Sequence, residues 1–172
     1  ESDAVALATN GIVTQAGNGN VSLTSLDGTI TIDQVVTAHG TGTVTIDAQD
    51  TGSDGTNDLT ITAAVSSTSG AISLTADQTI SAGNTVGTTG DITATATTGA
   101  ITSVGTDDIL SGAKVDLAAA TGIAAYTSAT TLEATNSTSG NIVITESDAV
   151  ALATNGIVTQ AVNGNVSLTS LD

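Results

Sequence analysis

The sequence predicts an all-β fold, a narrow β-solenoid with coils of about 20–28 residues. Three observations support this prediction: a long tandem duplication, a shorter period marked by glycines, and an apolar content made almost entirely of small aliphatic residues. Tyr126 is the single aromatic residue, and Phe, Trp, Met, Cys and Pro are absent. Compact globules fill their centres with large side chains, so this chain must build a thin core from Ala, Val, Ile and Leu.

The longest repeat joins the two ends of the sequence. Residues 146–172, the second copy, repeat residues 1–27, the first copy, at an offset of 145 residues, and Val162 in place of Gly17 is the one difference. Duplication this close is typical of tandem arrays. We therefore interpret residues 1–145 as one long repeat of about six coils and residues 146–172 as the start of the next.

A glycine followed by a strand of alternating apolar and polar residues recurs within the long repeat. The pattern begins at Gly19, Gly42, Gly70, Gly90, Gly112, Gly140 and Gly164. Alternation places every second side chain on the inner face, and we expect successive coils to stack these side chains on one another. The expected inward set is Val21, Leu23, Val44, Ile46, Ile72, Leu74, Ile92, Ile142 and Ile144. At Gly112 the alternation is one residue out of phase, carried by Val115 and Leu117, which predicts a β-bulge.

Each coil is also expected to hold a second alternating strand. These strands occupy residues 29–33, 59–63, 79–82, 100–104, 131–134 and 149–153. Shorter third strands follow, such as residues 11–14 and their copy 156–159. Gly, Asn, Asp and Ser separate the strands, as tight turns require.

Two other readings of the composition are disfavoured. Disorder is common in polar, highly charged chains, but the absence of Pro and the regular alternation of β-branched residues argue against it. Tandem immunoglobulin-like sandwiches fit the length of the repeat, but their cores use large aromatic residues that this chain lacks.

The charge excludes one class of partner. The chain has one Lys, no Arg and 17 acidic residues, a formal net charge of −16. Nucleic acid is excluded because its phosphates need Lys or Arg, and insertion into a membrane is not expected because no apolar run of about 18 residues exists. No signal peptide is visible, and without Cys the protein is not held together by disulfides.

The glycine-led strands resemble a known class of repeats. Gly70-Ala-Ile-Ser-Leu-Thr-Ala-Asp is the most typical stretch, with Thr- and Asn-rich turns between such strands along the chain. The pattern resembles the β-helical shafts of large secreted bacterial adhesins, of the filamentous-haemagglutinin type and of related autotransporter passengers. This resemblance implies a right-handed parallel β-helix, an extracellular or cell-surface location, and a role as an extended adhesive or structural fibre.

One acidic segment is a candidate metal site. The connection at residues 47–58 carries Asp47, Asp50, Asp54 and Asp58. Calcium prefers several carboxylate and carbonyl oxygens in a turn, so a bound Ca²⁺ is the one cofactor considered. The spacing matches neither an EF-hand loop nor the calcium-binding nonapeptide, and a solvated loop is the competing interpretation.

Catalysis is not expected. Asp107 and Asp108 are adjacent carboxylates, and neighbours in a strand or turn usually point apart. His39 has no second histidine with which to bind a metal and is interpreted as an exposed turn residue, and Lys114 as a surface charge near Asp116. Tyr126 is expected to be structural. Three Asn-x-Ser/Thr triplets begin at Asn20, Asn136 and Asn165 and would be sugar sites only in a glycosylating host.

The sequence therefore favours a non-enzymatic structural repeat of an extracellular fibre or adhesin shaft. Its expected partners are neighbouring copies of the same repeat, head to tail or within one long chain, with lateral contacts between fibres. An ice-binding or carbohydrate-active solenoid is the alternative. Thr-x-Thr pairs, such as Thr43 and Thr45, suggest ice binding, but unequal coil lengths argue against the flat ladder that ice recognition needs.

Overall fold

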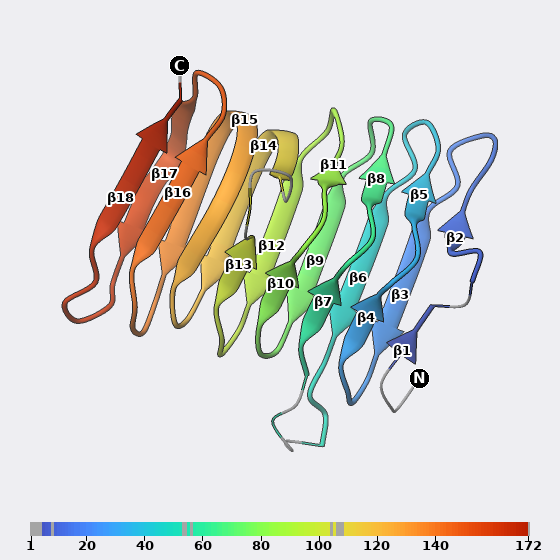
Figure 1. Ribbon diagram of the computed structural model, residues 1–172, viewed down its shortest axis with the longest axis horizontal. Helices are drawn as coiled ribbons and strands as arrows, with labels where there is room; N and C mark the ends of the chain where they lie inside the picture. The colour runs from blue at the N-terminus through green and yellow to red at the C-terminus, as the bar shows by residue number, and fades with distance from the viewer. Residues whose placement is uncertain are drawn as a thin grey trace.

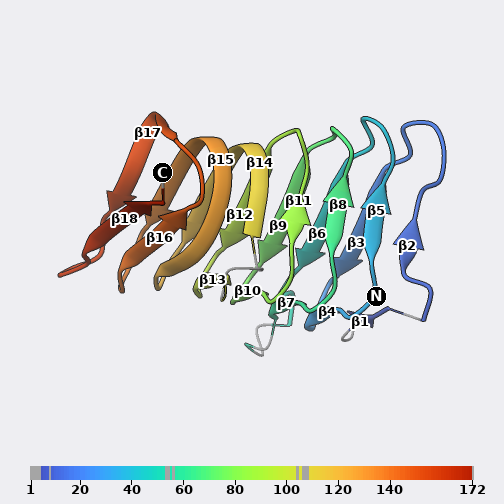
Figure 2. The same cartoon turned by 45° about the horizontal axis from the view of Figure 1, so that its top comes forward.

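The computed structural model describes residues 5–7, 9–52, 55, 57–103, 105 and 109–171. These residues form eighteen strands and no helix (Figure 1). All strands belong to one sheet, which curls around a central axis and pairs its strands in parallel between successive coils (Figure 2). Strands at the front of Figure 1 run upward, the chain crosses the top and descends behind, and the coils advance from right to left. This winding is right-handed, so the predicted fold class is confirmed.

Three stacks of parallel strands make three faces. Face 1 contains β3 (Val21–Ser25), β6 (Val44–Ala48), β9 (Ile72–Ala76), β12 (Ile92–Ala96), the C-terminal parts of β14 (Ile109–Ala119) and β15 (Ile123–Asn136), and β17 (Ala151–Thr159). Face 2 contains β1 (Val5–Ala6), β4 (Ile30–Ile32), β7 (Leu59–Ile61), β10 (Ile80–Ala82), β13 (Ile101–Ser103), the start of β15, β16 (Ile142–Glu146) and β18 (Val166–Ser170). Face 3 contains β2 (Ile12–Val13), β5 (Val36–Ala38), β8 (Val65–Ser67), β11 (Val86–Gly87), the start of β14 and the middle of β15.

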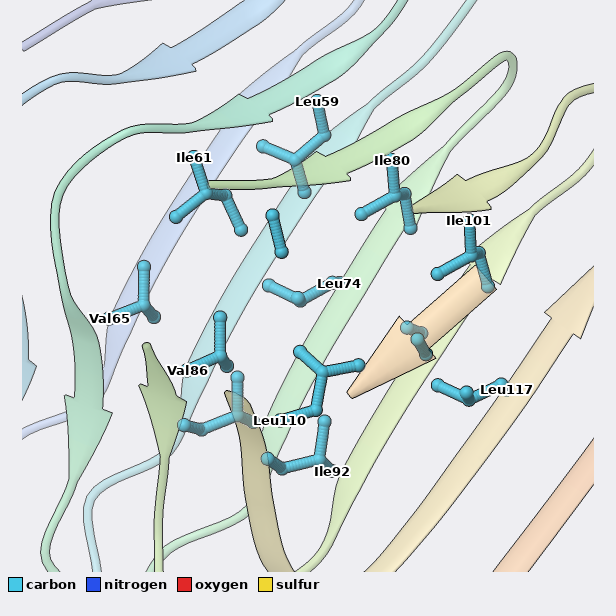
Figure 3. Packing of buried hydrophobic residues seen from close by; sticks show 14 of the residues in the cluster. Leu59, Ile61, Val65, Leu74, Ile80, Val86, Ile92, Ile101, Leu110 and Leu117 are labelled. Atoms are coloured by element: carbon cyan, nitrogen blue, oxygen red, sulfur yellow. The ribbon is translucent and has the colours of Figure 1, made fainter. Parts of the chain in front are cut away.

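The core is a set of apolar columns that run along the axis. On face 2, Ile80 pairs with Leu59 in the preceding coil and with Ile101 in the next, and all three are buried. Figure 3 shows these side chains converging with Leu74 and Ile92 from face 1. Of the predicted inward residues, all are buried except Leu23, which is partly buried at the first coil of the stack. Each coil thus depends on its neighbours for burial of its apolar face.

Close contact between coils explains the period of glycines. A Cβ added to Gly42 would clash with the carbonyl oxygen of Gly19, and one added to Gly70 would clash with that of Gly42. At Gly90 the nearest atom would be the Ser69 carbonyl oxygen, at 2.6 Å. Successive turns therefore leave no room for a side chain at these positions, which is why the sequence repeats Gly there.

The first four glycine-led strands stack as predicted, and the fifth does so without the expected bulge. Val115 pairs with Ile92, and Leu117 pairs with Ala94. The phase difference is absorbed at the corner between faces 3 and 1. There β14 continues through Gly112 as a strand. Leu110 pairs with Val86, and Val115 pairs with Ile92, but Val115 follows Leu110 by five positions, whereas Ile92 follows Val86 by six.

The prediction was wrong for the strands that follow Gly140 and Gly164. β16 pairs with the start of β15 on face 2, in register Ile142 with Ile123, and β18 pairs with β16. Face 1 at this level is occupied by residues 132–136, which overlap the second strand expected at residues 131–134. The cause is β15, a 14-residue strand that bends across all three faces. Its small Ala and Thr side chains let the chain pass both corners without a glycine turn.

The second copy consequently lies on different faces from the first. Ile12 is on face 3 and its copy Ile157 on face 1, while Val21 is on face 1 and its copy Val166 on face 2. Six coils on face 2 extend from Val5 to Ile142, which is 137 residues and not 145. The boundary between long repeats at residue 145 stays a prediction.

Candidate functional site

The predicted calcium ligands bond to separate backbone or side-chain groups. The Asp47 carboxylate accepts a hydrogen bond from Gln49 Nε2 at 2.6 Å, and the Asp58 carboxylate accepts one from the Thr79 N–H at 2.9 Å. Asp50 accepts a bond from the Gly55 N–H at 3.3 Å, and Asp54 lies outside the described residues. Within the described ranges, no three His, Cys, Asp or Glu residues lie close enough to hold a metal ion. Calcium binding by this loop therefore stays a prediction.

The best-defined polar cluster surrounds Lys114, the chain's only Lys or Arg. Its Nζ lies 2.6 Å from Oε2 of Glu133 and 3.1 Å from Oδ2 of Asp116. Glu133 is buried, and its Oε1 accepts a hydrogen bond from the Asn155 N–H at 3.1 Å. The cluster therefore links three successive coils on face 1, through β14, β15 and β17. The proximity of Lys114 and Asp116 was predicted from the sequence, whereas the contacts with Glu133 and Asn155 were not, because only the path of β15 brings these residues near.

Charge pairing shifts the pKa values in this cluster. The hydrogen bond from Lys114 holds the pKa of the Glu133 carboxyl below its ordinary value, against the opposing effect of burial. The pKa of Lys114 is raised, first by its hydrogen bond to Glu133 and then by that to Asp116. Both groups are thus charged near neutral pH, and the cluster acts as an ionic clamp between coils.

The clamp holds an irregular part of the second copy. β17 pairs Leu152 with Leu132 and then Ile157 with Ala134, so five residues of β17 span the distance that two residues of β15 cover. Asn155 lies in this bulge, where Glu133 binds its backbone N–H. The ionic clamp therefore helps to fix the second copy on face 1.

Glu146 begins the second copy and is completely buried. Its Oε2 accepts a hydrogen bond from Thr127 Oγ1 at 2.6 Å, and its Oε1 accepts one from the Ala129 N–H at 2.9 Å. The Asp148 N–H also donates to Oε1, at 3.3 Å. These bonds satisfy the buried carboxylate and tie β16 to β15.

The last described coil leaves an open edge. Among the described strands β18 pairs only with β16, and its inward side chains Val166 and Leu168 are 45% and 37% exposed. In the first copy, β6 pairs with β3, and Val21 is 4% exposed. Main-chain groups along the outer edge of β18 and an apolar strip beside them are thus available to a further strand.

A polar groove of about 330 Å³ crosses the corner between faces 3 and 1. Its lining includes Thr88, Thr89, Ser111, Ser128, Thr130 and Asp148. The groove exists because β14 and β15 pass this corner as continuous strands, whereas earlier coils carry projecting turns there. Its hydroxyls and the Asp148 carboxylate can form hydrogen bonds with a polar ligand.

The remaining predicted residues have structural surroundings. His39 is exposed next to a turn, as expected, and its Nδ1 lies 3.1 Å from the Gly17 carbonyl oxygen. Tyr126 is partly buried in β15, paired with Ile109 and Thr145. Asn136 is completely buried, and its Nδ2 donates to the carbonyl oxygens of Ser139 and Gly140, so this nitrogen cannot carry a sugar in the folded protein.

Asn20 and Asn165 are both exposed. Asp107 and Asp108 lie outside the described residues.

Comparisons with known proteins add no functional assignment. No protein-family model, curated protein or solved structure matches the chain. Among the described residues there is also no helix of the length and apolarity that crossing a membrane requires.

Proposed function

We propose that the chain is a non-enzymatic structural repeat of an extracellular fibre or adhesin shaft. One observation carries the proposal: the apolar columns run through successive coils, so that each coil buries its apolar face only against its neighbours. Each added coil extends the molecule by about 4.8 Å, the ordinary spacing between strands. Length and a repeated surface are the properties that such a stack provides.

The proposed partner of the open edge is another copy of the repeat. β18 has the same sequence as β3, Val-Ser-Leu-Thr-Ser, and β3 pairs in register with β6. The outer edge of β18 is therefore suited to a strand equivalent to β6, supplied by the same long chain or by a second molecule. This partner is favoured because it repeats a contact that the molecule already makes.

Electron microscopy of longer chains tests this proposal. A chain carrying three tandem copies of residues 1–145 should form a continuous rod that is longer by roughly 30 Å for each copy. Compact beads separated by linkers would contradict the proposal, since they would show that each repeat closes on itself. A chain with one copy provides the reference length.

The acidic surface supports a soluble fibre with separated neighbours. Residues 1–145 carry 14 acidic residues and one Lys. Over about six coils this places roughly one net charge per 2 Å of axis, much closer than the Debye length of about 8 Å at physiological salt. Lateral contacts between fibres would then need a divalent cation such as calcium to neutralise the carboxylates. Added calcium should therefore increase light scattering by the fibres more than monovalent salt of equal ionic strength does.

Ice binding is a second candidate, favoured by the outer surface of face 1. One outward column contains Ser22, Thr45, Ser73 and Thr93, and the parallel column contains Thr24, Asp47, Thr75 and Thr95. Loops absorb the differences in coil length, so the strands of these four coils pair in continuous register. Thermal hysteresis that is lost in Thr45→Val/Thr93→Val would support this function, and its absence from the unmodified chain would refute it.

A further inference from the structure

We propose that the first copy of one molecule replaces the second copy of another on the edge formed by β15 and β16, so that molecules join by strand exchange. The proposal deepens the proposed function, on which it rests, by naming the surface and the partner through which copies are joined. Residues 9–25 of the incoming molecule would take the place of residues 154–170.

The binding surface does not distinguish the two copies. Contacts to the second copy include hydrogen bonds from the backbone N–H of Asn155 to Glu133, of Gln160 to the Asn136 carbonyl, and of Asn165 to the Asn141 side chain. Asn10, Gln15 and Asn20 are the matching residues of the first copy. β16 pairs with Val-Ser-Leu-Thr-Ser in β18, and β3 offers the same five residues.

A rotation by one face lets the incoming molecule keep its own contacts. β2 and β3 lie on faces 3 and 1, and their copies in β17 and β18 lie on faces 1 and 2. Both strands are therefore displaced by one face in the same direction. In an incoming molecule turned by one face, one edge of β3 would pair with β16 of the other molecule. The opposite edge of β3 would stay paired with β6 of its own molecule. Successive molecules in a fibre would each be rotated by one face.

The single sequence difference makes the exchange directional. Gly17 has a φ of +75°, which a Val side chain adopts only under strain, whereas in the second copy the positive φ lies one position further along, at Asn163. Glycine adopts either conformation, so the first copy can take the turn of the second. A second copy that replaced a first copy would place Val162 at the positive φ of Gly17, which is strained. The exchange therefore proceeds in one direction, and the molecules join head to tail.

β18 and the turn before it are little buried by the described residues. All five residues of β18 are exposed, and Val162 is 85% exposed. The attachment of the second copy to the same chain, however, gives it a high effective concentration, in the millimolar range for short connections. Exchange is therefore expected in concentrated protein, or when the second copy is loosened.

Introduced cysteines test the exchange directly, because the chain has no native Cys. Val143 pairs with Ser167 in the same chain and Ser22 pairs with Thr45, and the side chains at 143 and 22 are exposed. Exchange alone would bring Ser22 of one molecule beside Val143 of another. At the spacing of paired strands, about 4.8 Å, a disulfide can form. Ser22→Cys/Val143→Cys should therefore give a ladder of disulfide-linked molecules under mild oxidation.

The matched variant Ser22→Cys/Ser167→Cys distinguishes exchange from simple stacking. Stacking without displacement of the second copy would link positions 22 and 167 and leave 143 unlinked. That result would overturn the exchange while leaving the proposed function intact. Ladders in neither variant would also overturn it, and the proposed function would still be decided by the length of the three-copy chain. Val143→Cys/Ser167→Cys should form a disulfide within one molecule and serves as the control for register.

A pair of proline substitutions provides a second readout. Proline lacks the backbone N–H that Asn155 donates to Glu133. Asn155→Pro should loosen the second copy and increase the oligomer fraction in sedimentation velocity, whereas Asn10→Pro should reduce it by removing the same donor from the incoming strand. Circular dichroism of both variants verifies folding. Equal effects of the two substitutions would contradict the exchange.

Discussion

The two copies of the 27-residue segment have almost the same sequence but different surroundings. Val21 of the first copy is 4% exposed, and its counterpart Val166 is 45% exposed. The first lies in a coil closed by Val5 and Ile12, which pack against the same core, and β6 follows it. β18 has β16 on one side and no described strand on the other. Local sequence thus determines a strand, whereas the neighbouring coils determine whether its apolar face is buried.

Charge substitution on the inward face should give the largest difference between the copies. Val21→Asp buries an unpaired carboxylate and should lower the free energy of unfolding by about 3 kcal/mol or more, whereas Val166→Asp should cost less than about 1 kcal/mol. Ile72→Asp, in a strand covered on both sides, provides the upper reference. Urea denaturation measures all three. Equal losses for Val21→Asp and Val166→Asp would show that the two copies have the same surroundings.

Residues 19–103 show how far the sequence predicts the fold. There, strands led by Gly19, Gly42, Gly70 and Gly90 stack on one face because tight turns and close contacts between coils leave a visible glycine period. From Ile109 onward, β14 and β15 continue through the corners as strands, and β15 contains no glycine at all. A strand that turns gradually has no local sequence signal, so the faces of later strands could not be derived.

The same limit applies to the candidate site. Alternation placed Glu133 within a strand, but the contact with Lys114 depends on a coil of 17 residues between Val115 and Leu132. No residue pattern in the sequence indicates that this coil has 17 residues. The acidic segment, by contrast, was predicted only from its high number of carboxylates. In the structure, the carboxylates of Asp47, Asp50 and Asp58 each accept a hydrogen bond from a different residue.

Adding the missing neighbour should make the copies alike. A chain extended beyond the second copy by the equivalent of residues 28–48 gives β18 the partner that β6 gives β3. Covering Val166 and Leu168 should slow amide hydrogen exchange in β18 and raise the melting temperature by a few degrees, since about 1 kcal/mol corresponds to roughly 2–4 °C at this size. An extension with scrambled sequence is the control. Unchanged exchange in β18 would mean that its open edge does not accept this strand.

Acidification should loosen the second copy before the first. The pKa of Glu133 in the folded chain lies below its ordinary value of 4.5, so its stabilising effect is present above that value and lost as pH falls through the folded pKa. The Lys114 pKa is raised above 10.5, so its contribution is present below that value and lost as pH rises through the raised pKa. Hydrogen exchange at Asn155, corrected for the intrinsic pH dependence, should therefore accelerate at low pH, with Val21 as the reference amide. In Glu133→Gln this acceleration should disappear, and its persistence would exclude the ionic clamp as its cause.

The smallest effect should come from exchanging the residues that differ between the copies. Gly17→Val places a β-branched side chain at a φ of +75° and should cost about 1 kcal/mol, even though no atom lies within 4 Å of its Cβ. Val162→Gly removes an exposed side chain without strain and should change stability by less than about 0.5 kcal/mol. Thermal melting of both variants measures the difference. If the two substitutions had equal effects, the turn at Gly17 would not need glycine, and the copies would be interchangeable in both directions.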